Sequence, residues 1–581
     1  MIFMLAVIIR VLSNSCATIE NLHGLDKKIF ARVSSKKSFS LFLSLSIRQK
    51  MAKNIRYTVA MIVCIVCCLC IITTKSANIL AILPTPSYSH QIPYQILWTT
   101  LSQRGHKVVV ITTDPINDPS LKNLTEVNLQ SSYYLMRNLK LIGDDGAIPW
   151  FNILRGQIWQ VSQDLASMIY EHPEVQKLYV PDSDEKFDVV IIETFTLPSL
   201  YPLAYRFNAP LIGLLSLGIA SSQYYIYGAP VLPSHPSSWE MEKDVTLNLS
   251  FWQRLKNFIR QWYHIYCVFN HFYPQHQALA EKYLGKYLGK DIPHIYDIER
   301  NMSVIFHNQE EVITYARPKT TNIIPFTGLH ISKKPARLPK NLERFLMNAP
   351  DGFIYLSLGT NVRLSVAEHM IDIFRNVLAN LPCKVLWKID MQLSNKPDNI
   401  YISNWFPQQS ILAHPKLRLF VYQGGLQSTE EAVYYAIPLL GIPMFADQFV
   451  QVNKMVSLGV ARQLDYLNIS EKSLNASIMD MLNDNRYKER MLKIKALIRD
   501  KPYDQLNNTI WWIEFVIRHK GAPHLQSSIA HYPWYQRYDM DIIAFLSIVI
   551  FVALLCGLIV VYNVVKIIFN CYAKTKKEKI N

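Results

Sequence analysis

The stretch that decides the fold is residues 417–431, which read LRLFVYQGGLQSTEE. Its apolar run, Leu417–Tyr422, predicts a strand buried on both faces, because helices cover both faces of a parallel sheet. Two glycines follow, and Ser428–Tyr435 has the spacing of a helix. Glycines let a phosphate approach the backbone, and N–H groups at a helix start attract anions. The stretch therefore predicts a strand, a turn that suits a phosphate, and a helix.

Apolar runs and helical segments continue to alternate on both sides of this stretch. The expected elements are strands Phe353–Leu358, Lys384–Lys388 and Leu439–Ile442, helix Val366–Leu378 and loop Pro443–Asp447. Such alternation is typical of a parallel sheet with helices on both faces. Residues 346–530 are therefore predicted to form one Rossmann-like domain.

A second series of this kind occupies residues 77–330. Its expected elements are strands Asn78–Leu83, Lys107–Thr112 and Val189–Ile192, loop Pro84–Ser89 and helix Tyr94–Arg104. Residues 331–345 are polar, contain two prolines and are predicted to be a linker. The predicted fold is α/β, with two Rossmann-like domains facing a cleft at the carboxyl ends of their strands.

The net charge of +16 is concentrated at the two ends of the chain. Residues 1–50 carry eight Lys or Arg and two Asp or Glu, and residues 566–581 carry five Lys and one Glu. The ends thus supply +10 of the charge, and the centre is only mildly basic. A nucleic-acid-binding face needs a basic patch with interleaved aromatic residues, which the sequence does not show. We therefore expect no nucleic-acid partner.

An uncharged run of 21 residues, Ile542–Tyr562, predicts a membrane-spanning helix. At about 1.5 Å per residue it covers roughly 30 Å, the thickness of a bilayer core. Aromatic residues precede it and the basic tail 563–581 follows, which places the tail in the cytosol by the positive-inside rule. Residues 51–76 have the three regions of a signal peptide, so residues 1–50 are interpreted as a non-native extension. Together these segments predict a single-pass type I protein with a luminal body.

The nine cysteines indicate neither a disulfide framework nor a zinc site. Only Cys267 and Cys383 fall in the predicted domains, and the other seven lie in the extension or in or beside apolar runs. Two Asp-x-Asp patterns, 182–184 and 539–541, have a spacing that can hold a metal, but each lies in a polar or membrane-adjacent segment. We interpret both as solvated and expect no metal site.

The deciding stretch is flanked by an ordered set of motifs. They are Trp405-Phe406-Pro407-Gln408, His414-Pro415, Ile437-Pro438 and Asp447-Gln448. This set resembles the signature of the UDP-glycosyltransferase (UDP-glucuronosyltransferase) family. The sequences of residues 89–94 and 422–428 are most similar to those of its insect branch. The resemblance covers residues 77–581. It implies a GT-B fold, in which the first domain binds an acceptor and the second binds a UDP-sugar.

Matched position by position, the resemblance implies a role for each motif residue. Trp405 stacks on uracil, Gln408 hydrogen-bonds nearby, and Glu431 accepts from the ribose hydroxyls. The remaining implied ligands of UDP are Thr360, Gln423, Gly424, Gly425 and Ser428, and those of the sugar are Asp447 and Gln448. Many members have His at the position of Gln423, but an amide can also donate to a phosphate oxygen.

The same resemblance implies a catalytic pair, His90 and Glu193. Alone, His90 would more commonly be an ordinary polar group in a loop, and Glu193 a helix cap or surface carboxylate. In the family, a catalytic His and its acidic partner occupy these positions. The carboxylate would fix the imidazole tautomer while the other ring nitrogen takes a proton from the acceptor hydroxyl. The expected reaction inverts the anomeric carbon and uses neither a metal nor a cofactor.

Several alternatives stay open. The chain could be a non-catalytic relative that binds lipophilic molecules, or an epimerase or lipid-sugar synthase on the same fold. The insect-like wording favours UDP-glucose over UDP-glucuronate as the donor, the expected acceptor is small and lipophilic, and a homo-oligomer is compatible. Lys577 and Lys579 form either a dilysine signal for the endoplasmic reticulum membrane or ordinary flanking charge. Six sequons are glycosylation candidates, at Asn123, Asn248, Asn301, Asn468, Asn475 and Asn507.

Overall fold

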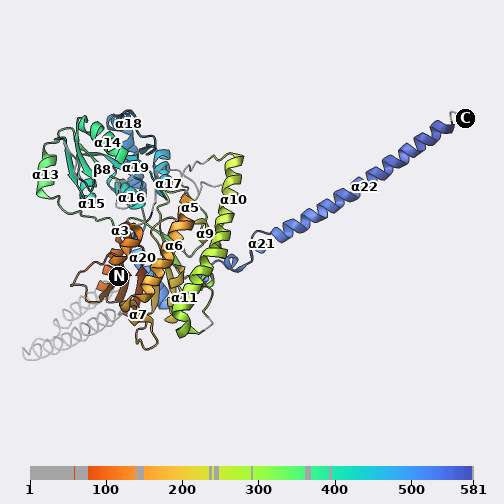
Figure 1. Cartoon of the computed structure of the whole chain (residues 1–581), viewed down its shortest axis with the longest axis horizontal. Helices are drawn as coiled ribbons and strands as arrows, with labels where there is room; N and C mark the ends of the chain where they lie inside the picture. Colours follow the sequence, from red (N-terminus) through yellow and green to blue (C-terminus); the bar gives the residue numbers. More distant parts are fainter. Residues whose placement is uncertain are drawn as a thin grey trace, which may run out of the picture. The chain divides into compact units, whose positions relative to one another are not determined.

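Seven short strands pair as one parallel sheet in the computed structural model, whose chain is drawn in Figure 1. The strands are β1 (Asn78–Leu83), β2 (Lys107–Thr112), β3 (Leu124–Asn128), β4 (Val189–Glu193), β5 (Leu211–Leu215), β6 (Val304–Asn308) and β7 (Ile323–Phe326). Their order is β3-β2-β1-β4-β5-β6-β7. Alternate side chains of β1 enter different cores, with Ile79 and Ala81 on one face and Leu80 and Ile82 on the other. Burial on both faces explains why the central strands β1, β4 and β5 are almost continuously apolar, whereas the edge strand β3 is largely polar.

The structure describes residues 58, 76–137, 139, 150–233, 239–240, 248–289, 292–359, 368–391 and 396–578. All elements named below belong to one compact unit, Ser76–Asn581. The predicted extension 1–50, the predicted signal peptide up to residue 75, and Thr360 lie outside the described residues.

Helices cover both faces of the first sheet. One face packs against α3 (Tyr88–Gln103) and α20 (Gln505–His519). The other packs against α6 (Trp159–Glu171), α8 (Pro202–Arg206) and α11 (Tyr273–Leu288). Helix α20 lies in the segment 346–530 expected to belong to the second domain, yet its Ile510, Ile513 and Val516 complete the core of the first.

A second parallel sheet has six strands in the order β10-β9-β8-β11-β12-β13. They are β8 (Phe353–Ser357), β9 (Lys384–Lys388), β10 (Ile400–Ser403), β11 (Leu417–Tyr422), β12 (Leu439–Gly441) and β13 (Ala461–Gln463). One face is covered by α14 (Glu368–Ala379) and α18 (Glu471–Asn483). The other is covered by α13 (Lys340–Met347), α16 (Leu426–Tyr435), α17 (Gln448–Ser457) and α19 (Arg486–Arg499). The two predicted Rossmann-like sheets are confirmed.

Of the remaining α-helices, α10 and α22 are long and the others have seven residues or fewer. They are α4 (Tyr133–Arg137), α5 (Trp150–Ile153), α7 (Pro173–Tyr179), α9 (Ser221–Ile226), α10 (Phe251–Cys267), α12 (Ile295–Arg300), α15 (Gln408–Leu412), α21 (Trp534–Arg537) and α22 (Met540–Glu578). Figure 1 shows α10 and α11 following one another as one long helical segment. Helix α22 has the length and apolar composition to cross a membrane, and it continues well beyond the predicted end at Tyr562.

Three helix boundaries differ from the sequence prediction. Helix α3 begins at Tyr88 and carries Pro93 inside it, whereas the sequence placed a loop up to Ser89 and a helix from Tyr94. Pro93 is the sixth residue of α3, a position where proline removes a backbone donor and is usually disfavoured, so local propensity does not predict it inside the helix. Helix α16 begins two residues earlier than predicted, at Leu426. The predicted linker is helical from Lys340, because Leu342 and Leu346 pack into the second core.

Each sheet changes the direction of strand order at one point. The chain moves outward from β1 through β2 to β3 and then returns to β4 beside β1; in the second sheet the corresponding neighbours are β8 and β11. The strands that flank this point diverge in their connections, which leaves a crevice at their carboxyl ends. The residues just after β1, β4, β8 and β11 are therefore placed to form a site.

Candidate active site

His90 lies in the first turn of α3, immediately after the switch point of the first sheet. The extended backbone of Ser87 starts the helix, and the His90 N–H donates to the Ser87 carbonyl at 2.9 Å. The sequence analysis left His90 between a loop ending at Ser89 and a helix starting at Tyr94, so it missed that His90 is helical. A helical backbone limits where the imidazole can point, so its position depends on how the β1–α3 turn is held.

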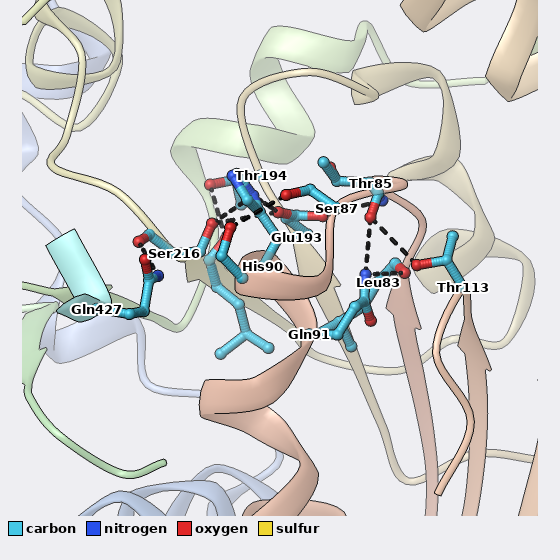
Figure 2. Close-up of polar contacts among 12 residues, drawn as sticks. Leu83, Thr85, Ser87, His90, Gln91, Thr113, Glu193, Thr194, Ser216 and Gln427 are labelled. Atoms are coloured by element: carbon cyan, nitrogen blue, oxygen red, sulfur yellow. Dashed lines mark hydrogen bonds and ion pairs between the residues drawn. The ribbon is translucent and has the colours of Figure 1, made fainter. Parts of the chain in front are cut away.

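The turn that carries His90 is fastened by Gln91 (Figure 2). The Gln91 amide donates to the carbonyls of Leu83 and Thr85 at 3.0 and 2.9 Å, and its oxygen accepts from Thr112 Oγ1 at 2.8 Å. Gln91 is buried, so these bonds form in a region of low dielectric. The network ties the start of α3 to the ends of β1 and β2.

Figure 2 shows that His90 meets two side chains from neighbouring strands. His90 Nδ1 lies 2.9 Å from Glu193 Oε1 and 2.6 Å from Ser216 Oγ, and Ser216 Oγ lies 3.4 Å from the same carboxylate oxygen. Glu193 is the last residue of β4, and Ser216 follows the last residue of β5. The structure thus brings the predicted pair together and adds a hydroxyl. With Nδ1 engaged, Nε2 is the nitrogen available for a proton.

The second oxygen of Glu193 is held as well. Glu193 Oε2 accepts from the Thr85 N–H at 3.3 Å, and the side chain is buried. A carboxylate held from both sides orients the imidazole firmly, because neither oxygen can turn away without losing a bond.

Across the cleft, Gln423 lies at the end of β11, beside the switch point of the second sheet. Its amide is wedged between two glycines: a Cβ on Gly359 or Gly425 would stand 2.2 or 3.1 Å from Nε2. Its Oε1 is buried without a hydrogen-bond partner among the described residues. Gly425 caps α16, so the Gln423 amide and the first N–H groups of this helix share one corner.

Gly424 serves the fold at this corner. Its φ is +97°, and a Cβ there would lie 2.6 Å from Val452 and 2.8 Å from the Gln448 carbonyl. Gly424 does not line the cavity described below. It allows α17 to approach the end of β11, which contrasts with its implied contact to UDP.

Glu431, on α16, is held by two amides from α15. Its carboxylate accepts from Gln408 at 2.7 Å and from Gln409 at 3.1 Å, while Gln408 also donates to Ser428 Oγ at 3.0 Å. Burial raises the pKa of Glu431 to about 7, although both amide bonds oppose the rise. The group therefore exchanges its proton near neutral pH, and further donors would favour its ionised form.

Trp405 is half exposed, at 53%, and presents its ring at the mouth of the site. The Tyr88 ring meets it edge-on at 5.6 Å, and Lys388 Nζ stands 4.7 Å from the ring centre. Lys388 also donates to the Gly359 carbonyl at 3.2 Å. An exposed indole framed in this way offers a flat surface for a base.

Asp447 ends the turn that follows β12, and Gln448 is the first residue of α17. Gln448 Oε1 accepts from the N–H groups of Met444 and Phe445 at 2.9 and 3.2 Å. The amide nitrogen takes no part in these two bonds. Asp447 Oδ2 is buried without a hydrogen-bond partner among the described residues. Burial raises the pKa of Asp447 to about 6, and attraction by His90 opposes the rise. An unpaired buried carboxylate oxygen is costly unless a donor reaches it.

A cavity of about 520 Å³ is lined by residues of both domains. Ten of the predicted site residues line it: His90, Glu193, Trp405, Gln408, Gln423, Gly425, Ser428, Glu431, Asp447 and Gln448. Its first-domain side is mainly apolar and includes Ile158, Leu165, Phe195 and Trp239. The first-domain side of the cavity is thus an apolar chamber, and His90 lines the same cavity as the predicted donor-site residues.

The sequence analysis missed Ser216, Gln409, Lys388 and Tyr88. A Ser just after a buried strand is a weak signal, and no short motif links it to His90. The sequence signal for Gln409 is its place next to Gln408. The structure shows that both amides donate to Glu431.

The six sequons lie in different surroundings. Asn468 is exposed in a turn, whereas the Asn507 oxygen accepts from Arg104 at 3.0 Å and Thr509 of its sequon is buried. Use of any of these sites remains a prediction.

The two Rossmann-like domains that line one cavity form a GT-B fold. A solved glycotransferase of kitacinnamycin superposes with a TM-score of 0.50 at 19% identity, covering 76% of this chain and 99% of that structure. At this identity the likeness shows the fold alone.

The family follows from the sequence over most of the chain. Residues 78–579 match the model of the UDP-glucoronosyl and UDP-glucosyl transferase family, so the chain belongs to this family and is a UDP-glycosyltransferase. UDP-glucosyltransferase 2 of Dactylopius coccus is 32% identical, over 87% of this chain and 96% of the relative. UDP-glucuronosyltransferase 2B19 of Macaca fascicularis is 29% identical, over 88% of this chain and 96% of the relative. The resemblance to the family and to its insect members is confirmed.

Proposed function

We propose that the protein transfers glucose from UDP-glucose to a hydroxyl of a small lipophilic acceptor, with inversion at the anomeric carbon. The observation that carries this proposal is the bonding of His90 Nδ1 by Glu193 and Ser216 at the edge of an apolar chamber. A base held in this way is ready to take a proton from a hydroxyl bound in that chamber.

In the proposed step, His90 Nε2 removes the acceptor proton as the acceptor oxygen bonds to the anomeric carbon. The bond from that carbon to the UDP oxygen breaks, and UDP leaves with the electron pair. Glu193 stabilises the imidazolium that forms. Attack from the face opposite UDP inverts the configuration.

The second domain supplies the donor site in this proposal. Trp405 stacks on uracil, Glu431 accepts from the ribose, and Asp447 and Gln448 bind the sugar hydroxyls. Gln423, Ser428 and the start of α16 offer neutral donors to the diphosphate, so charge on UDP can be stabilised without a cation. We therefore expect the reaction to withstand EDTA.

The charges around the cavity favour a neutral sugar. Lys388 is the one Lys or Arg among the described cavity-lining residues, and it lies against Trp405, on the nucleotide side. Glu193 and Asp447 flank the place proposed for the hexose. A uronate carboxylate there would face two acidic groups, and the described lining residues offer no Lys or Arg beside them, which costs binding energy. This supports glucose over glucuronate.

We further propose that α22 anchors the protein in the endoplasmic reticulum membrane, with the catalytic body in the lumen. The helix contains an 18-residue window of mean hydropathy 3.1 that is not buried by the rest of the protein. Basic residues gather at its carboxyl end, which favours a cytosolic tail.

The first test is UDP release by microsomes that contain the full chain, with a phenol panel and either UDP-glucose or UDP-glucuronate. We expect acceptor-dependent release with UDP-glucose that disappears in His90→Ala. Release with UDP-glucuronate alone would overturn the donor assignment. Acceptor-independent UDP release equal in both variants would overturn the proposed transfer.

A further inference from the structure

Helix α10 carries a broad exposed apolar stripe. Phe251, Trp252, Leu255, Phe258 and Ile259 are between 38 and 74% exposed. Their spacing of three and four residues places them on one side of the helix. Large aromatic side chains are rarely exposed together to water, so this stripe indicates a surface that binds another apolar surface.

The opposite side of α10 is bound to the protein. Asn257, His264 and Ile265 are buried, and the Ser250 hydroxyl caps the helix by accepting from the Gln253 N–H. The helix is therefore held with its apolar stripe turned outward, because rolling it inward would expose these buried groups.

The stripe continues to the start of α22. Trp262 lies three, four and seven residues after Ile259, Phe258 and Leu255, so it belongs to the same side of α10. Its ring stands 5.5 Å from the ring of Tyr538, edge to face, and Tyr538 precedes α22 by two residues. The exposed stripe therefore begins where the apolar C-terminal helix begins.

Arg537 fixes this junction to the folded body. Its guanidinium stands 4.2 Å from the centre of the Tyr225 ring and donates to the carbonyls of Tyr225 and Ala530. The Tyr225 ring in turn meets Trp262 at 6.0 Å. Contacts from α9, α10 and α21 thus hold the start of α22 close to the stripe.

The charges on α10 suit a phospholipid surface. The helix contains Arg254, Lys256 and Arg260 and no Asp or Glu. Arg254 and Lys256 are exposed. By helical spacing these cations flank the stripe on its two sides, as in helices that lie at the level of lipid headgroups.

We propose that α10 is a second membrane contact, lying in the interface with its stripe among the lipid headgroups beside α22. This inference rests on the proposed anchoring by α22. The bilayer is favoured over a second copy of the chain because the stripe is continuous with the anchor and because the charged residues within α10 are all cations. Two contacts would fix the orientation of the body on the membrane.

The test uses the full chain in phosphatidylcholine–phosphatidylserine vesicles that contain a diazirine phospholipid. After illumination, labelled positions are mapped by mass spectrometry. Met347 in α13 and Leu497 in α19, which are 66 and 62% exposed, serve as controls of equal exposure far from α10 in sequence. We expect label on residues 251–266 and on α22, and background label at the controls.

The outcomes separate the two proposals. Label on α22 with background on α10 would overturn the second contact and leave the anchor in place. Background on both would overturn the anchor itself. Cross-links between the α10 helices of two chains, in place of lipid label, would make the stripe a dimer interface and overturn the membrane contact.

A double variant, Trp252→Ser with Phe258→Ser, is compared with Leu497→Ser. We expect the double variant to lose the α10 label while α22 stays labelled and transfer to a water-soluble acceptor is unchanged. Unchanged α10 label in this active variant would show that the stripe does not carry the contact.

Discussion

The two halves of the cleft differ in how their polar groups are satisfied. On the acceptor side, His90, Glu193 and Ser216 bind one another. On the donor side, Gln423 Oε1 and Asp447 Oδ2 are buried without partners among the described residues, and the pKa of Glu431 is raised by burial. The protein thus organises the proposed base by itself, whereas we propose that a hydroxyl of the bound UDP-sugar supplies the partner of Asp447 Oδ2.

This difference has a physical reason. A general base must be oriented before the acceptor arrives, so its second nitrogen is bound within the protein. Across the cleft the proposed ligands of the UDP-sugar are held only in part. Glu431 accepts from Gln408 and Gln409, whereas Asp447 Oδ2 has no hydrogen-bond partner among the described residues. The following predictions test this division.

The largest effect is expected for His90→Ala. Loss of the base should lower kcat by about 100- to 10,000-fold. Affinity for UDP, measured by calorimetry, should stay as in the wild type because His90 belongs to the acceptor side. A large loss of UDP affinity would break the division between the halves.

Asp447→Asn should impair binding of the UDP-sugar, whereas His90→Ala should impair kcat. The variant keeps an oxygen but loses a charge-assisted bond to the sugar, so KM for the UDP-sugar should rise by about 10- to 100-fold. Affinity for UDP alone should change little, because UDP lacks the sugar. Equal losses for UDP and UDP-glucose would place Asp447 outside the sugar site.

Glu431 should make UDP binding depend on pH. Ribose hydroxyls donate to the carboxylate, so binding should weaken by up to about tenfold per unit as pH falls below 7. In Glu431→Gln this slope should disappear when Kd is measured from pH 5.5 to 8. A wild-type Kd that is flat over this range would contradict the assigned role.

The free energy of unfolding of the unliganded enzyme should change with pH in the direction opposite to UDP affinity. Folding raises the pKa of Glu431 from 4.5 to about 7, so the folded chain keeps a proton that the unfolded chain releases. This contribution to the free energy of unfolding is present below pH 4.5 and is lost as pH rises through about 7.

The smallest effect is expected for Ser216→Ala. Glu193 still orients the imidazole, so loss of one hydrogen bond should lower kcat by about 2- to 10-fold. The pH profile of kcat should shift, which separates a positioning role from a change in folding, and Ser216→Thr should restore part of the activity. A variant equal to wild type in rate and pH profile would remove Ser216 from the catalytic group.

Local pattern predicted seven of the thirteen strands that the structure describes, and the existence of both sheets. The apolar runs of β1, β2, β9 and β11 have the predicted bounds, because strands buried on both faces must be continuously apolar. Short motifs also pointed to most donor-side residues, since Gln423, Gly425 and Ser428 lie close together in the chain. The sequence by itself therefore determined the two Rossmann-like halves and the motif residues at the carboxyl ends of their strands.

Tertiary structure decided the contacts between distant segments. Ser216 contacts His90, 126 residues away in sequence, because β5 lies beside β4. No local motif specifies that strand order. Helix α20 returns to the first sheet, and Pro93 is accommodated inside α3, for reasons of packing that local propensity does not contain. Periodicity and short motifs encode the elements, whereas strand order and core packing select which side chains meet.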